Sequence, residues 1–128
     1  MNTPQLLYAL ALQAVPNIGD ITAKKLIRHC GSPEAVFKES KASLLKIEGI
    51  GTHSIKNIYQ STHLKTAEKE LIFMEKNSIQ GLYFEDANYP FRLKHCIDGP
   101  IVFFQKGTID WEKRPIISVV GTRKITTY

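Results

Sequence analysis

The feature that most constrains the fold of this chain is a short turn that occurs twice in its first half. Residues 15–19 read Val-Pro-Asn-Ile-Gly and residues 47–51 read Ile-Glu-Gly-Ile-Gly, and a helical pattern follows each of them. The glycines that close the two turns, Gly19 and Gly51, lie 32 residues apart. This is the scale of a repeated unit made of two helices and a turn. The chain is therefore expected to begin with a compact group of short helices.

Capping signals and apolar spacing predict five helices in residues 1–60. Thr3-Pro4 is a typical start for the first, Gly31 a typical end for the second, and Ser32-Pro33 a typical start for the third. The fourth is expected over roughly residues 41–46 and the fifth after Gly51. The apolar residues at helical spacing are the expected core of this half: Leu6, Leu7, Leu10, Ala14, Ile21, Leu26, Ile27, Val36, Ile55, Ile58 and Tyr59.

The repeated turn resembles that of the tandem helix-hairpin-helix (SAM-like) modules of DNA repair and recombination proteins. Glycines let such a turn bend so tightly that backbone N–H groups and the next helix N-terminus face outward, where they can bind a DNA phosphate. Asn17 stands in place of the first glycine of the first turn, and asparagine tolerates a left-handed backbone. The candidate DNA contacts on this basis are Gly19, Lys24, Lys25, Gly49, Gly51 and Lys56. Such repeats also serve as protein-binding or spacer modules, and the sequence leaves both uses open.

From about residue 64 the pattern changes to that of an α/β fold. An amphipathic helix is expected over residues 65–77, and strands are expected over residues 79–84, 101–104 and 115–120. The last strand is a continuous apolar run, which is typical of a parallel sheet covered on both faces. A short helix is expected between the first two strands, close to Leu93.

These patterns predict two domains of different class. Residues 1–63 are expected to form an all-α helical domain, and residues 64–128 the first part of a parallel α/β domain. The linker between them is expected at residues 61–63. The predicted fold class is therefore mixed α and α/β.

Three motifs in the second half resemble the DprA (Smf) family of bacterial DNA-processing proteins. They lie within about residues 85–125 and follow the order of the family: Tyr89-Pro90 with Leu93, then Ile97-Asp98 with Pro100, Val102-Phe103-Phe104 and Lys106-Gly107, then Val119-Val120-Gly121-Thr122-Arg123. Residues 5–60 resemble the amino-terminal domain of that family more loosely.

The resemblance implies a non-enzymatic recombination mediator that binds single-stranded DNA during natural transformation and helps to load the RecA recombinase. The family binds the strand in a basic pocket of a Rossmann-like domain and commonly dimerises through that domain. Its glycine-Ser/Thr-Arg motif falls on Gly121, Thr122 and Arg123, with Lys124 next. A turn that follows a parallel strand lies where α/β sheets bind ligands, so Arg123 is expected to bind a phosphate with its planar guanidinium group. No cofactor is implied.

The sequence stops a few residues after the third expected strand, whereas a Rossmann-like sheet has several more strands. We therefore expect this chain to be a fragment of a longer protein. The absent strands would complete the sheet, the DNA pocket and the neighbours that residues 115–120 need.

The composition is compatible with this function but does not require it. Seventeen Lys and Arg residues against 12 Asp and Glu give a net charge of +5, and the excess is spread over both halves. No apolar run is long enough to span a membrane, and the start lacks the pattern of a secretion signal. Only two cysteines are present, which does not suggest a disulfide framework. These features favour a cytoplasmic protein.

Other constellations point less clearly to a site. The pairs His29-Cys30 and His95-Cys96 lack the spacing of a zinc site, so no metal is expected. Trp111, in a charged loop, is the aromatic residue most expected to be partly exposed, as a loop anchor or as a contact for a base or a partner. Two other functions stay open. One is an enzyme of the nucleotide phosphoribohydrolase type, whose glycine-rich turn also binds phosphate, and the other is a protein-interaction module that does not bind DNA.

Overall fold

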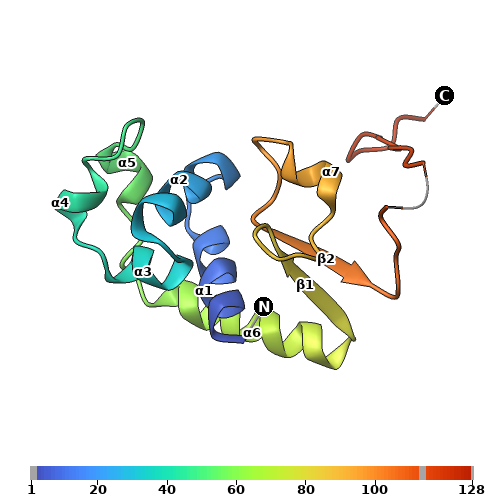
Figure 1. The fold of residues 1–128 in the computed structure, drawn as a ribbon, viewed down its shortest axis with the longest axis horizontal. Helices are drawn as coiled ribbons and strands as arrows, with labels where there is room; N and C mark the ends of the chain where they lie inside the picture. Colours follow the sequence, from blue (N-terminus) through green and yellow to red (C-terminus); the bar gives the residue numbers. More distant parts are fainter. Residues whose placement is uncertain (1–2, 113–114, 128) are drawn as a thin grey trace.

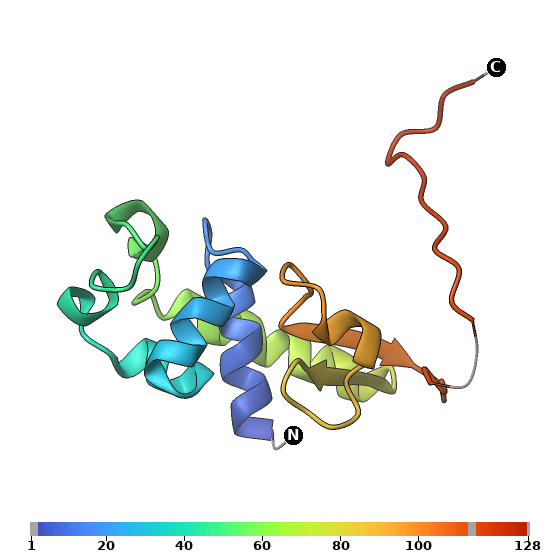
Figure 2. The ribbon, with the colours of Figure 1, turned by 45° about the horizontal axis from the view of Figure 1, so that its top comes forward.

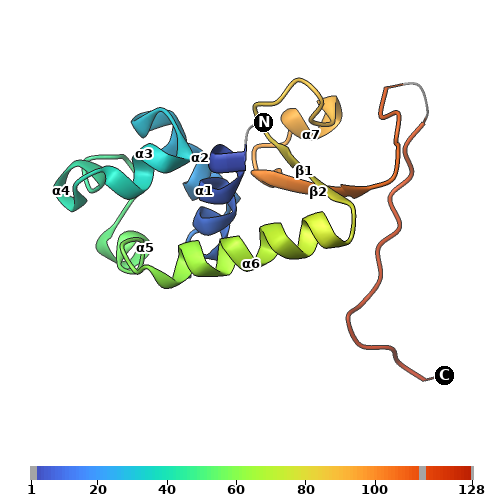
Figure 3. The same ribbon diagram turned by 90° about the horizontal axis from the view of Figure 1, so that it is seen from below.

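The computed structural model describes residues 3–112 and 115–127 of the chain (Figure 1). Helices α1 to α5 gather on one side, and β1, β2 and α7 lie on the other. Helix α6 runs beneath both groups, as Figure 3 shows from below. The elements are α1 (Thr3–Ala14), α2 (Asp20–Cys30), α3 (Pro33–Lys38), α4 (Lys41–Leu44), α5 (Thr52–Ile55), α6 (Thr62–Lys76), β1 (Ile79–Tyr83), α7 (Phe91–Lys94) and β2 (Val102–Lys106).

Local capping explains where several of these helices begin and end. The Ser32 hydroxyl accepts a hydrogen bond from the backbone N–H of Ala35 at 3.1 Å, at the start of α3. Gly31 ends α2 with a φ of 99°, and its N–H donates to the Ile27 carbonyl. The predicted end of the second helix and start of the third are confirmed. The fifth helix is shorter than predicted, because α5 ends at Ile55, although Ile58 beyond it is still fully buried.

The two repeated turns have the same backbone geometry. Asn17 and Gly49, at equivalent places, have positive φ angles of 68° and 81°. Gly19 and Gly51, two residues later, are both extended and directly precede α2 and α5. The expectation that Asn17 can replace the first glycine is therefore confirmed, because it adopts the left-handed conformation that this turn requires.

The two strands pair in antiparallel fashion, so the expected parallel arrangement is wrong for β1 and β2. Their register places Ile79 opposite Lys106 and Tyr83 opposite Val102. The reason lies in the connection between them. It turns back at the end of β1, where the Phe84 N–H donates to the Ile101 carbonyl at 2.9 Å. A chain that returns at the same end of the sheet makes an antiparallel neighbour.

The strand expected over residues 115–120 does not form in the structure. These residues have no regular secondary structure and belong to a tail that runs away from β2 (Figure 2). The side chains of Ile117, Val119 and Val120 are 86%, 95% and 90% exposed. A strand is stable only where a neighbour pairs with its backbone groups, and the described part of the chain places no strand beside this segment.

One hydrophobic core runs through both halves of the chain. It joins residues of the α1–α5 group to residues of α6, β1 and β2, and its largest fully buried members include Leu12, Leu26, Leu44, Ile55, Ile58, Ile101 and Val102. Residues 61–63, expected as a linker, are instead the N-cap and the first two residues of α6, and His63 is buried with its Nε2 2.6 Å from the Asn57 carbonyl. The division into two domains at residue 63 stays a prediction, and in the structure the two parts share this core.

Two residues expected in the core lie at the surface. Ile21 is 42% exposed on the first turn of α2. Tyr59 is 47% exposed, and its hydroxyl donates to the Glu39 carbonyl at 2.6 Å. The tyrosine therefore uses its polar end to hold the loop after α3, which is common for side chains that are apolar at one end and polar at the other.

Candidate functional site

The residues predicted to bind phosphate, Gly121 to Lys124, lie in the exposed tail beyond β2 (Figure 2). The Thr122 hydroxyl donates to the Lys124 carbonyl at 2.6 Å, which bends the backbone locally. The side chains of Arg123 and Lys124 are exposed to solvent. In the described part of the chain, the segment that carries this motif does not belong to a β-sheet. The role of the motif in phosphate binding stays a prediction.

Lys24 was expected at the DNA-binding surface, but the structure buries it between the two halves. It is only 7% exposed, and its Nζ lies 3.2 Å from the Ile97 carbonyl and 3.4 Å from the Cys96 carbonyl. The same ammonium group lies 5.6 Å from the centroid of the Phe84 ring. The charge of Lys24 is therefore used to hold α2 against the segment after α7. It cannot reach a DNA phosphate in this arrangement.

Two further polar residues connect the first turn region to the backbone at the start of β2. The Asp20 carboxylate accepts from the Ile101 N–H at 3.0 Å, and the Gln13 side-chain amide donates to the Val102 carbonyl at 3.4 Å. Asp20 is also the first residue of α2, so its negative charge already lies at the helix N-terminus. A hollow of about 330 Å³ beside Gly19 is lined by these same side chains. The first turn region therefore connects the two halves of the chain through hydrogen bonds.

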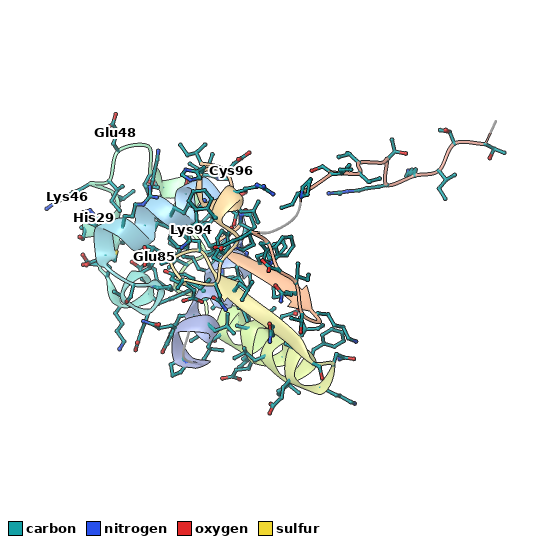
Figure 4. The ribbon with its side chains drawn as sticks, turned by 45° about the vertical axis from the view of Figure 1, so that its right-hand side comes forward. His29, Lys46, Glu48, Glu85, Lys94 and Cys96 are labelled. Atoms are coloured by element: carbon teal, nitrogen blue, oxygen red, sulfur yellow. The ribbon has the colours of Figure 1, made fainter. Side chains whose placement is uncertain are left out.

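The second turn is open to solvent and lies against the basic outer face of α2. Lys25 and Arg28 line a hollow of about 460 Å³ together with Ile47, Glu48 and Gly49. A Cβ atom added at Gly49 would lie 3.0 Å from the Lys25 Nζ, so the lysine extends across to the turn. Figure 4 shows Glu48 at the outer end of its loop, pointing away from the rest of the chain.

The structure therefore brings together two of the predicted contacts, Lys25 and Gly49, and separates both from Lys24. Gly51 and Lys56 are exposed at the two ends of α5, and Gly19 is exposed at the first turn. Sequence reasoning missed Arg28. Its signal was its position three residues after Lys25, which places the two side chains on the same face of α2.

The cysteines and buried tyrosines do not form a reactive centre in the described residues. Burial raises the pKa of the Cys30 thiol, and the nearby Glu39 carboxylate raises it further, so this group is a neutral thiol at pH 7. Burial likewise raises the pKa of Tyr83 far above its ordinary value, with smaller contributions from Glu85 and Asp86. Within the part of the chain that the structure describes, no three His, Cys, Asp or Glu side chains lie close enough to hold a metal ion.

Comparison with known protein families gives a match in the second half of the chain. Residues 80–128 match the sequence profile of the family described as DNA recombination-mediator protein A. The matched segment begins inside β1 and includes α7, β2 and the tail with Arg123. Neither a curated protein nor a solved structure matches the chain significantly. Among the residues that the structure describes, no helix combines the length and the apolar character needed to cross a membrane.

Proposed function

We propose that this chain, whose residues 80–128 match the family of DNA recombination-mediator protein A, is a member of that family and binds single-stranded DNA as part of a cytoplasmic recombination mediator. The observation that carries the proposal is the family match over the segment that ends in the exposed basic tail. In this proposal the protein helps to load RecA onto incoming DNA during natural transformation. Its role is binding, without a catalytic step.

The proposed contact in the tail is made by Gly121, Thr122, Arg123 and Lys124. Gly121 has no side chain, so the DNA strand can approach its backbone closely. The guanidinium group of Arg123 can donate two parallel hydrogen bonds to one phosphate, and Lys124 adds a positive charge next to it. In a longer chain with further strands, residues 115–120 could pair as part of a Rossmann-like sheet, which would hold this motif in place.

The second turn offers a further backbone contact of the helix-hairpin-helix kind. Lys25 and Arg28 are exposed beside Gly49, while Gly51 and Lys56 lie at α5. Contacts of this type bind phosphate without reading the base sequence. The Glu48 carboxylate lines the same hollow and repels a phosphate group. The second turn is therefore expected to bind DNA more weakly than the tail. The first turn makes none, because Lys24 and Asp20 are used inside the protein.

The test is fluorescence anisotropy with a labelled single-stranded oligonucleotide and a matched duplex, each at two salt concentrations. The unaltered chain should prefer the single strand and lose affinity as salt rises. Arg123→Ala should weaken binding about tenfold and make the salt dependence less steep by about one phosphate contact. Lys69→Ala, which removes the same charge from the exposed side of α6, is the matched control.

The outcomes separate the proposed function from its main alternative. Equal losses for Arg123→Ala and Lys69→Ala would mean that only the overall charge matters and that the tail motif is not a site. If the chain binds neither oligonucleotide, the DNA-binding function fails, and a protein partner becomes the better explanation of the exposed tail.

A further inference from the structure

A hollow with aromatic walls lies between α7 and the loop that follows β2. Phe91, the first residue of α7, is 63% exposed and lines it from one side. Trp111 lines it from the loop after β2, and Arg92 and Glu112 complete its wall around about 400 Å³. An adjoining hollow of about 260 Å³ shares Phe91, Trp111 and Glu112.

The aromatic groups are held in place before any ligand arrives. The indole N–H of Trp111 donates to the Gln105 side-chain oxygen at 3.1 Å, and its ring packs edge-on against Phe103 at a centroid distance of 5.5 Å. On the other side, the Phe91 ring packs edge-on against His95 at 4.6 Å. A wall that is already ordered loses little side-chain freedom when a ligand binds.

The charges around the hollow decide which kind of ligand fits. Asp110 and Glu112 carry carboxylates at its border, which disfavours a phosphate group. Arg92 also lines it, which disfavours a cationic side chain of a protein partner. A flat, uncharged group that can stack on aromatic rings suits this wall best, and nucleobases bind to proteins in this way without sequence preference.

We propose that this hollow is a stacking subsite for a nucleobase of single-stranded DNA, formed by Phe91 and Trp111. The subsite deepens the proposed function and rests on it. When a strand is bound, the tail contacts its phosphate groups and the hollow contacts one of its bases. Glu112 of the hollow and Arg123 of the tail lie 11 residues apart in the sequence, so one strand can contact both.

Trp111 provides the probe, since it is the only tryptophan in the sequence. Its fluorescence is measured while a single-stranded oligonucleotide is added, and again with an abasic strand of the same length and charge. The strand with bases should quench Trp111, whereas the abasic strand should not. Deoxyadenosine monophosphate should also quench it, at much higher concentration, and deoxyribose phosphate should not.

Variants connect this signal to binding. Phe91→Ala should weaken the affinity for the single strand about tenfold in anisotropy, the loss expected for one stacked base. Phe73→Ala, which truncates a similarly exposed phenylalanine on α6, should leave it unchanged. Circular dichroism before and after heating shows whether each variant keeps its fold. If Phe91→Ala unfolds, Phe91→Leu replaces it, since leucine keeps the apolar contact but not the ring.

Each outcome decides between the subsite and the wider function. If the labelled strand binds but Trp111 is not quenched and Phe91→Ala binds normally, the subsite is wrong and the DNA-binding function stands. If the mononucleotide quenches Trp111 while no strand binds, the hollow binds free nucleotides, and both the subsite for single-stranded DNA and the DNA-binding function are wrong. If a lysine-rich peptide quenches Trp111 and nucleotides do not, the hollow is a cation site and the inference is overturned.

Discussion

Single residues in this protein show how burial changes what a polar side chain can do. Tyr83 and Tyr89 are both buried, yet their hydroxyl groups differ. The Tyr89 hydroxyl donates to the Pro100 carbonyl at 2.6 Å, whereas the Tyr83 hydroxyl has no hydrogen-bond partner among the described residues. A buried polar group without a partner destabilises the fold, and a buried group with one contributes to it.

Replacing each tyrosine with phenylalanine should therefore have opposite effects. Tyr83→Phe is expected to raise the free energy of unfolding by about 1 kcal/mol, and Tyr89→Phe to lower it by about 1 kcal/mol. Urea denaturation followed by circular dichroism measures both. A loss of stability in Tyr83→Phe would mean that its hydroxyl has a partner, such as a bound water.

Tyr83 should also make the stability depend on alkaline pH. Its pKa is raised in the folded protein from an ordinary value of 10.0, mainly by burial. The folded state therefore binds this proton more tightly than the unfolded state does. Below pH 10 the hydroxyl is neutral in both states and has no pH-dependent effect, whereas the free energy of unfolding falls as the pH rises above that value. Denaturation midpoints between pH 8 and about 11 should fall less steeply in Tyr83→Phe than in the unaltered chain.

Lys24 is the corresponding case for a charged group. Lys24→Met keeps the apolar stem but removes the ammonium group that bonds to the Cys96 and Ile97 carbonyls. We expect a loss of about 1–2 kcal/mol in the free energy of unfolding. Lys25→Met, the exposed neighbour, should change it by less than about 0.5 kcal/mol. Equal effects in thermal denaturation would show that the bonds of Lys24 do not matter for stability.

At the scale of elements, the two turns share a backbone conformation but have different uses. The first turn packs toward β2, where Asp20 bonds to Ile101, directly before the strand, and Gln13 bonds to Val102, its first residue. The second turn faces solvent beside Lys25 and Arg28. The same local geometry thus serves as a joint in one place and as an open surface in the other, because different elements lie next to it.

The requirement for glycine in the second turn can be tested with a matched pair. Gly49 has a φ of 81°, which costs a residue with a side chain about 1–2 kcal/mol. Gly51 is extended and has open space around it, so alanine fits there. Gly49→Ala should therefore lower the melting temperature clearly, while Gly51→Ala should leave it nearly unchanged. The reverse order would mean that the turn has another conformation in solution.

At the scale of the whole molecule, the shared core and the exposed tail predict different responses to truncation. Residues 1–63 alone would lose the apolar cover that Ala67, Met74 and Val102 provide, and we expect them to unfold without a cooperative transition. A chain that ends at residue 112 keeps the whole core, so it should melt within a few degrees of the full chain but bind DNA more weakly. Cooperative unfolding of residues 1–63 would instead support two independent domains.

The local features of the fold could be predicted from the residues, because they depend on neighbours in the chain. The left-handed Asn17, the glycine that ends α2 and the capping serine of α3 all follow from backbone sterics and short-range hydrogen bonds. The strands near residues 79–84 and 101–104 follow from apolar and β-branched runs. The family motifs near Tyr89 and Val102 were likewise readable from short stretches of sequence.

The features that could not be predicted depend on which distant segments meet. Lys24 looks like a surface lysine beside a turn, and only the packing of α2 against residues 96 and 97 buries it. Residues 115–120 have a strand-like composition, but a strand needs a neighbour to pair with, and here its apolar side chains face solvent. Phe91 and Trp111 lie 20 residues apart in the sequence and meet at one hollow because the loop after β2 folds back along the strand, where Trp111 contacts Phe103 and Gln105. Hydrogen bonds and burial between distant segments are long-range interactions, so residue type and spacing carry little information about them.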